Sequence, residues 1–135
     1  MSFVIDASVA LKWVLDEPGA DAAAALRGET LIAPELWLVE AANALWRRAR
    51  RGEMSEAQAK ERLTWLCGAP VSAAPIGRDL LAAAGLASAL DHPVYDCLYL
   101  ALAIREDTHV ITADHRFHAV VEASPMAGRV RLLGN

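Results

Sequence analysis

Short apolar runs alternate with helical stretches along this chain, and that alternation constrains the fold more than any other feature of the sequence. Each run is too short for a helix, and several are rich in β-branched side chains. The runs occupy 3–5, 30–33, 71–74, 109–112 and 130–133. Strands that alternate with helices are typical of a parallel sheet covered by helices on both faces. The sequence therefore predicts a three-layer α/β/α sandwich with a mostly parallel sheet of about four to five strands.

Glycine, proline and capping residues divide the intervening stretches into predicted helices. The predicted helical ranges are 7–15, 20–27, 34–51, 55–67, 79–90, 94–105 and 114–121. Pro34 suits the first turn of the third helix, Gly52 ends that helix, and Ser55 is placed to cap the next one. The helix at 94–105 is apolar on nearly all sides and is expected at the centre of the fold. The last strand, 130–133, is expected at an edge of the sheet.

The length and composition fit one domain over residues 1–135. More than half of the residues are hydrophobic, and no linker, internal repeat or low-complexity tract interrupts the chain. No apolar run approaches the roughly 20 residues that span a membrane, and the N-terminus lacks the basic start and apolar core of a signal peptide. Cys67 and Cys97 do not form a CxxC pair, so a reduced, cytoplasmic compartment is the simplest expectation.

The net charge of −4 argues only weakly against a nucleic-acid partner. If four of the 17 acids form one metal site, the acids that remain balance the 13 lysines and arginines. The mild acidity of the chain therefore excludes few functions.

Four acidic residues occupy positions that suggest a shared site. Asp6 follows the first predicted strand and Asp114 the fourth, and the carboxyl ends of parallel strands meet where α/β proteins bind ligands. Glu40 lies in the first two turns of the third helix and Asp96 in the first turn of the apolar helix. Both have mostly apolar neighbours, and a buried carboxylate must be paired, protonated or bound to metal. The basic residues offer too few partners, because most cluster at 47–51 or lie on polar segments.

Each acid also has a purely structural interpretation. Asp6, Asp96 and Asp114 stand where a carboxylate caps a helix or favours its N-terminus. Glu40 could pair with a surface arginine. Taken singly, the two interpretations are equally supported, whereas the shared sheet edge favours a functional role for the four acids together.

Four ordered segments across nearly the whole chain carry a family resemblance. They are FVIDAS at 3–8, LVEAANAL at 38–45, YDCLYLALA at 95–103 and TAD at 112–114 with Phe117. Each segment alone is short, but their order and spacing together are specific. In these segments the sequence resembles PIN-domain proteins and, more narrowly, the VapC toxins of bacterial toxin–antitoxin pairs.

The resemblance implies a metal-dependent endoribonuclease that acts as the toxin of a type II toxin–antitoxin system. It also implies a sheet flanked by helices, a homodimer and a cognate antitoxin partner. The acidic quartet that it implies is Asp6, Glu40, Asp96 and Asp114, and none of these positions departs from the family pattern.

Carboxylate oxygens suit Mg²⁺ or Mn²⁺ rather than zinc. Because Mg²⁺ keeps several waters and takes one or two carboxylates directly, we expect Asp6 and Asp96 to bind the ion. Glu40 and Asp114 either bind it too or hold its waters, and Glu40 is alternatively the general base. In such a site, a metal-activated water attacks the RNA phosphodiester bond while the metal stabilises the charge that develops on oxygen.

Further polar residues are candidates for supporting roles. Ser8 and Thr112 are placed to hydrogen-bond a carboxylate or a metal-bound water, although they are equally well explained as ordinary helix-start and strand-end residues. Arg47 shares a helical face with Glu40 and is a candidate for binding an RNA phosphate. Arg116 is a weaker candidate for the same role.

The chain uses tryptophan freely although aromatic residues are sparse. Trp37 and Trp46 fall in the third predicted helix, and Trp13 in the first. Partly exposed tryptophans often anchor partner segments, so the resemblance suggests an antitoxin groove near these two helices.

Two other functions fit this acid-rich chain less well. A phosphoacceptor receiver needs an acidic pair after the first strand and a suitably placed lysine, yet Ala7 and Ser8 follow Asp6 and the only lysines are Lys12 and Lys60. A non-catalytic binding or regulatory domain with the same fold remains the alternative. The complete set of four acids argues against it without refuting it.

Overall fold

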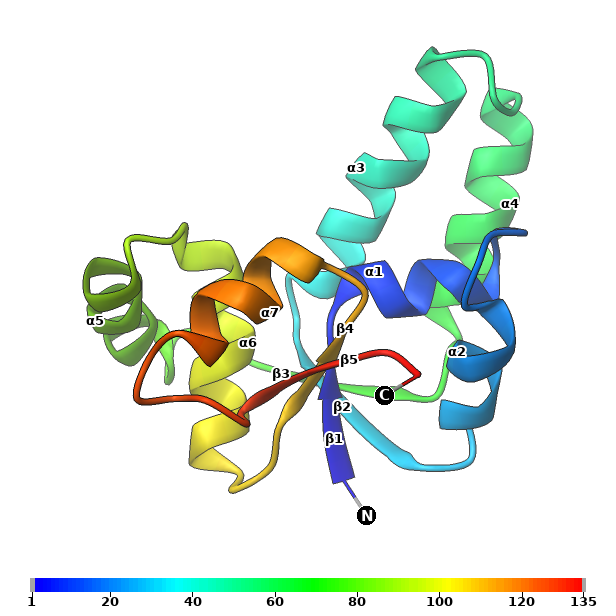
Figure 1. Ribbon diagram of the computed structural model, residues 1–135. Coiled ribbons are helices and arrows are strands. Elements are labelled where there is room, and N and C mark those ends of the chain that lie inside the picture. The colour runs from blue at the N-terminus through cyan, green and yellow to red at the C-terminus, as the bar shows by residue number, and fades with distance from the viewer. Residues whose placement is uncertain (1, 135) are drawn as a thin grey trace.

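The computed structural model describes residues 2–134, and its strands form one sheet in the order β3-β2-β1-β4-β5 (Figure 1). The strands are β1 (Ser2–Ile5), β2 (Thr30–Pro34), β3 (Val71–Ala74), β4 (Val110–Thr112) and β5 (Val130–Leu132). Every neighbouring pair of strands is parallel. The predicted α/β class is therefore confirmed, and β5 is an edge strand as expected.

Helices cover both faces of this sheet. They are α1 (Ala7–Ala10), α2 (Ala20–Leu26), α3 (Trp37–Arg50), α4 (Glu56–Cys67), α5 (Leu80–Leu90), α6 (Val94–Arg105) and α7 (His115–Glu122), with the 3-10 turn η1 (Leu11–Trp13) after α1. In Figure 1, α5, α6 and α7 gather on one side of the strands and α1 to α4 on the other. Helices α3 and α4 pack side by side and project beyond the sheet.

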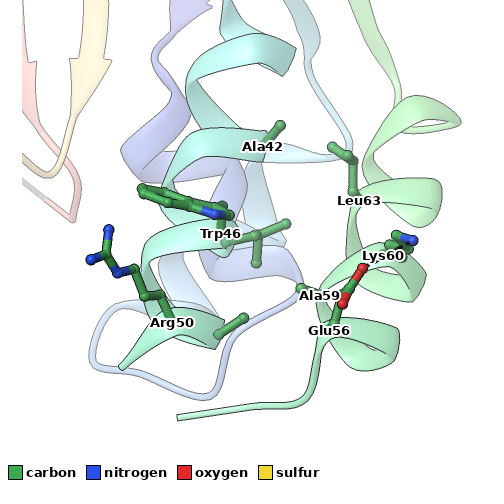
Figure 2. Close-up of a pocket in the computed structure, with 9 residues that line it drawn as sticks. Ala42, Trp46, Arg50, Glu56, Ala59, Lys60 and Leu63 are labelled. Carbon is green, nitrogen blue, oxygen red and sulfur yellow. Dashed lines mark ion pairs between the residues drawn. The ribbon is translucent and has the colours of Figure 1, made fainter. Parts of the chain in front are cut away.

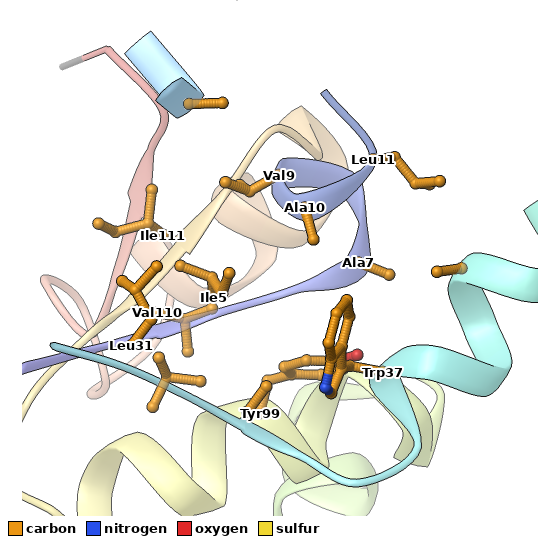
Figure 3. Close-up of a cluster of buried hydrophobic side chains, with 14 of the residues drawn as sticks. Ile5, Ala7, Val9, Ala10, Leu11, Leu31, Trp37, Tyr99, Val110 and Ile111 are labelled. Carbon is orange, nitrogen blue, oxygen red and sulfur yellow. The ribbon is translucent and has the colours of Figure 1, made fainter. Parts of the chain in front are cut away.

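The core forms where the central strands meet helices from both layers. Ile5 pairs with Ile111 in the parallel register of β1 and β4, and both side chains are buried. Figure 3 shows these strands between α1 on one side and the rings of Trp37 and Tyr99 on the other. Because apolar helices press on both faces, β1 reads as a continuous apolar run rather than an alternating one.

Helix α6 is the most deeply buried helix, as its sequence predicts. All residues from Cys97 to Ala103 are buried, and the helix packs against β1, β2 and β4. A helix enclosed on nearly every side carries polar residues only where they have a partner or a function. The acid in its first turn, Asp96, is therefore expected to have a partner or a function.

Two predicted helix boundaries are wrong. Pro34 is not in a helix; it ends β2, where it is paired with Ala74, and α3 begins three residues later at Trp37. The Glu35 amide then donates to the Ala74 carbonyl at 2.8 Å, so strand pairing outweighs the preference of proline for a first helical turn. The first helix is also shorter than predicted, because the chain tightens into η1, where the Trp13 indole donates to the Ala23 carbonyl at 2.7 Å.

Local capping signals in the sequence are confirmed at α4. The Ser55 side chain accepts from the Gln58 amide at 3.0 Å, and the Gln58 side chain accepts from the Ser55 amide at 2.9 Å. This reciprocal capping box satisfies two amides that the first turn of α4 leaves free.

Among residues 2–134, no helix has the length and apolar character needed to cross a bilayer.

The enclosure of α6 predicts a strong dependence of stability on its apolar side chains. Leu100 is fully buried, whereas Val39 on α3 is 70% exposed. Leu100→Ala should lower the free energy of unfolding by about 2–5 kcal/mol through reduced burial and a residual cavity. The control Val39→Ala, at an exposed position, should change it by less than about 0.5 kcal/mol. Urea titrations followed by circular dichroism measure both values, and equal losses would contradict this account of the core.

Candidate functional site

Four carboxylates line one cavity at the carboxyl ends of β1 and β4. The cavity has a volume of about 250 Å³, and its acids come from four different elements. Asp6 and Asp114 follow β1 and β4, Glu40 comes from the first turn of α3, and Asp96 comes from the first turn of α6. The structure thus brings together all four acids that the sequence singles out.

Asp6 is the most buried of these carboxylates, with only 6% of its surface exposed. Ser8 Oγ donates to its Oδ1 at 2.5 Å, and Thr112 Oγ1 donates to its Oδ2. Its Oδ1 also accepts from the Val9 amide at 3.3 Å, which caps α1. The structural interpretation of Asp6 as a helix cap is therefore correct, and it is compatible with a place in the cavity wall.

The hydroxyls of Ser8 and Thr112 connect Asp6 to the segment that carries Asp114. Ser8 Oγ accepts from the Ala113 amide at 3.0 Å, and Thr112 Oγ1 accepts from the Asp114 amide at 3.0 Å. Asp114 in turn caps α7 by accepting from two amides of its first turn. Each hydroxyl both donates and accepts, so the two acidic segments are held in one hydrogen-bonded junction.

Glu40 is held by a residue that sequence reasoning did not single out. The phenol of Tyr99, on α6, donates to Glu40 Oε1 at 2.5 Å. Burial and the adjacent carboxylate raise the pKa of Tyr99, so the phenol stays protonated and remains a donor. Glu40 therefore has a tyrosine partner rather than the surface arginine considered in its structural interpretation.

Asp96 has a histidine partner that the sequence analysis also missed. His92 Nε2 lies 2.6 Å from Asp96 Oδ2, and its ring stacks on Phe117 with centroids 5.4 Å apart. His92 is buried, and its Nδ1 has no hydrogen-bond partner among the described residues. The four-residue spacing of His92 and Asp96 is the sequence signal that could have revealed this contact. Because His92 lies before the start of α6, the spacing does not indicate a pair on one helix face.

The local environment raises the pKa of two of the acids. Burial is the main cause for Asp6, whose pKa rises to about 6 against the opposing hydrogen bonds of Ser8 and Thr112, and the charge of Asp96 adds to the rise. Burial likewise raises the pKa of Glu40, and Asp96 again contributes, while the Tyr99 phenol opposes the change. A nearby cation would favour both ionised carboxylates.

The donor set fits a hard divalent cation. The cavity offers carboxylate oxygens, and its volume accommodates several waters at about 30 Å³ each. No three histidine, cysteine, aspartate or glutamate side chains within residues 2–134 are already close enough to enclose a metal. Mg²⁺ requires only one or two carboxylates and keeps its waters, so an open, acid-lined cavity suits it better than a closed cage.

Cys97 follows Asp96 but does not belong to this donor set. Burial, reinforced by the charge of Asp96, raises the pKa of the Cys97 thiol to about 11. The thiol is therefore protonated at neutral pH, and Cys97 is not among the residues that line the cavity.

The two arginines predicted to bind RNA differ in their relation to the cavity. Arg47 lines it together with Glu40 and Ala44, as their spacing along α3 predicts. Arg116 is exposed near the start of α7 and is not among the residues that line the cavity. Only Arg47 therefore adjoins the acids directly.

The fold and the four carboxylates at the carboxyl edge of the parallel sheet can be compared with known protein families. The family description "PIN domain" matches residues 3–123 of the sequence. The chain belongs to the PIN domain family, whose members are generally metal-dependent nucleases and often pair with antitoxins and bind RNA.

A solved structure supports the same fold. The crystal structure of PAE2754 from Pyrobaculum aerophilum superposes with a TM-score of 0.70 at 24% sequence identity, covering 96% of this chain and 83% of that chain. No curated protein matches the sequence significantly.

The raised pKa of Asp6 predicts how the metal-free protein responds to pH. Its ordinary pKa is 3.8 and its pKa in the folded chain is about 6, so the folded state binds the proton more tightly. This contribution to stability is complete below pH about 4 and is lost as the pH rises through about 6. Asp6→Asn should make that decline shallower, because the side chain at this position then no longer titrates.

Urea unfolding in EDTA across this pH range measures the effect. The matched control Asp91→Asn, at an exposed position outside the cavity, should leave the pH profile of the wild-type chain unchanged. If the pH profiles of wild type and Asp6→Asn are identical, the assignment is refuted, because the difference between them isolates the titration of Asp6.

Proposed function

We propose that this protein is a Mg²⁺- or Mn²⁺-dependent endoribonuclease that acts as the toxin of a type II toxin–antitoxin pair. The observation that carries the proposal is the convergence of four carboxylates from four separate elements on one cavity. Membership of the PIN domain family supports the nuclease class. The RNA substrate and the toxin role are proposed on the resemblance of the sequence to VapC toxins.

In this proposal the four acids form the metal site, with Asp6 and Asp96 as direct ligands. When bound, the cation supplies a water of lowered pKa and stabilises charge on the phosphate oxygens. Ser8 and Thr112 keep the Asp6 carboxylate in a fixed orientation, because each hydroxyl donates to a different oxygen. Orientation of a ligand by such a partner is a common requirement of metal sites.

The remaining two acids complete the cavity wall. Glu40 is held by Tyr99 through one oxygen, which leaves its other oxygen to bind the cation, to hold a water or to accept a proton from it. Asp114 uses one oxygen to cap α7. The proposed role of Asp114 is to hold a metal-bound water with its second oxygen.

The antitoxin partner is proposed to occupy the apolar groove between α3 and α4. The groove has a volume of about 560 Å³ (Figure 2), and Trp46 on its wall is 54% exposed. Its lining residues are Ala42, Leu45, Trp46, Ala49, Arg50, Glu56, Ala59, Lys60 and Leu63. An apolar floor with charged ends suits one face of an amphipathic partner helix. The sequence suggested an antitoxin site near the first and third predicted helices; this groove involves the third but not the first.

Two further parts of the proposal concern assembly and location. Helices α5 and α6 pack together and expose Leu80, Leu81 and Tyr95, which supports a second copy of the chain as the partner of that face. Cys67 and Cys97 are both free, which supports the reducing cytoplasm as the compartment.

Metal binding should stabilise the folded protein. At a hundredfold excess over its dissociation constant, a cation that binds only the folded state adds about 2.7 kcal/mol. For a chain of this size that raises Tm by roughly 10 °C. Differential scanning fluorimetry with Mg²⁺, Mn²⁺ or EDTA measures the shift. Absence of any shift at millimolar metal would contradict the proposed site.

Cleavage assays test the activity itself. Asp96→Asn should reduce Mg²⁺-dependent cleavage of RNA at least about a hundredfold, because it removes a charge that the cation needs. The matched control Asp91→Asn makes the same chemical change at an exposed residue outside the cavity and should cleave like wild type. Labelled RNA fragments separated on a gel give the rates. Equal cleavage by Asp96→Asn would identify a contaminating nuclease, and a folded wild-type protein that cleaves no RNA would favour the non-catalytic alternative.

A further inference from the structure

A second cavity of opposite charge adjoins the acidic one. It has a volume of about 430 Å³ and shares four lining residues with the acidic cavity: Ser8, Leu11, Ala44 and Arg47. Its other charged lining residues are Lys12, Glu17, Arg48 and Arg51. Four cations therefore surround this space with a single acid, although the chain as a whole carries a net charge of −4.

That single acid forms ion pairs with two of the four cations. Glu17 accepts from Lys12 Nζ at 3.1 Å through Oε1 and from Arg48 Nη2 at 2.9 Å through Oε2. The Lys12 ammonium also donates to the Pro18 carbonyl at 2.7 Å. One carboxylate thus holds two cationic side chains, one from the segment after α1 and one from α3, in the wall of the same cavity.

The other two cations are more available to a ligand. Arg47 is exposed and forms no ion pair with any residue in the described range 2–134. Arg51 pairs with Glu53 at 2.8 Å, but its side chain is 65% exposed, and exposed pairs of this kind are worth little. Both arginines can therefore direct their guanidinium groups to an incoming anion at small cost.

The spacing along α3 links the two cavities into one path. Glu40 and Arg47 are two helical turns apart, or roughly 10 Å at 1.5 Å per residue, and Arg51 lies one turn further. We propose that the basic cavity binds the phosphate groups of the RNA strand immediately beyond the bond positioned at the acidic cavity. The proposal rests on the ribonuclease function proposed above and assigns a phosphate-binding subsite to Lys12, Arg47, Arg48 and Arg51.

A polyanion is the ligand that fits this arrangement of charge. Cations cluster around the space, so a metal ion is repelled from it, whereas guanidinium groups bind phosphate oxygens through paired hydrogen bonds. The neighbouring carboxylates repel the same strand, and the basic cavity offsets that repulsion where the strand leaves the metal site. An acidic protein segment is the competing occupant, and a binding experiment distinguishes the two.

The test measures binding separately from cleavage. Every variant is built on Asp96→Asn, which keeps the probe intact, and fluorescence anisotropy follows a short, labelled single-stranded RNA in Mg²⁺ at several salt concentrations. Arg47→Gln combined with Arg51→Gln should weaken binding about tenfold. The slope of log K against log salt should become shallower by about 0.7 for each phosphate that the variant no longer neutralises.

Arg50→Gln is the matched control. It removes the same charge from the same helix, but Arg50 lies over the Trp46 ring at 5.5 Å and lines the apolar groove instead of the basic cavity. Its affinity and salt slope should equal those of the Asp96→Asn parent. If Arg47, Arg50 and Arg51 contribute equally to RNA affinity, the effect is non-specific electrostatic attraction and the subsite is refuted.

Other outcomes separate the subsite from the proposed enzyme. If wild-type protein cleaves RNA but the double arginine variant binds the probe like its parent, the subsite fails and the nuclease stands. If wild-type protein cleaves nothing while the arginine variants lose affinity as expected, the subsite stands and the nuclease fails. If polyglutamate displaces the RNA at a lower concentration than unlabelled RNA does, the cavity is assigned to an acidic protein segment and the proposal is overturned.

Discussion

The hydrogen-bonded junction at Asp6 is the interaction on which the site depends. Its two carboxylate oxygens receive the hydroxyls of Ser8 and Thr112, which in turn accept amides from the segment that follows β4. The parallel pairing of β1 with β4 brings these groups together. Without the two hydroxyls, the buried Asp6 carboxylate would lose its hydrogen bonds to water and gain few in return. The junction therefore ties the central strands together and prepares the acidic cavity at the same time.

The acidic cavity illustrates how a functional site lowers the stability of the chain that builds it. Burial, and to a smaller extent the charge of Asp96, raises the pKa values of Asp6 and Glu40. Each carboxylate is nevertheless held by neutral donors, including the Tyr99 phenol on Glu40. Neutral donors orient the acids without cancelling their charge, whereas the cation of a salt bridge would cancel it. The negative potential is thus preserved for a cation. The stability that the buried acids cost is offset by the packing of the surrounding core.

Helix α3 organises the surfaces around this cavity. Its first turn supplies Glu40 to the acids, its later turns supply Arg47 and Arg48 to the basic cavity, and its opposite side presents Trp46 to the groove against α4. An α-helix can serve three surfaces because residues four apart share a face while adjacent residues diverge. Helices α3 and α4 project beyond the sheet (Figure 1).

Hydrophobic periodicity and capping are local properties, so the sequence predicts the alternation of strands and helices, the burial of α6 and the positions of the four acids. Tertiary structure places Pro34 at the end of a strand, since pairing with Ala74 outweighs its local helical preference. It also decided the partners of the acids: Tyr99 reaches Glu40 across 59 residues. Such contacts depend on how elements distant in the chain pack against one another, and no local pattern encodes that packing.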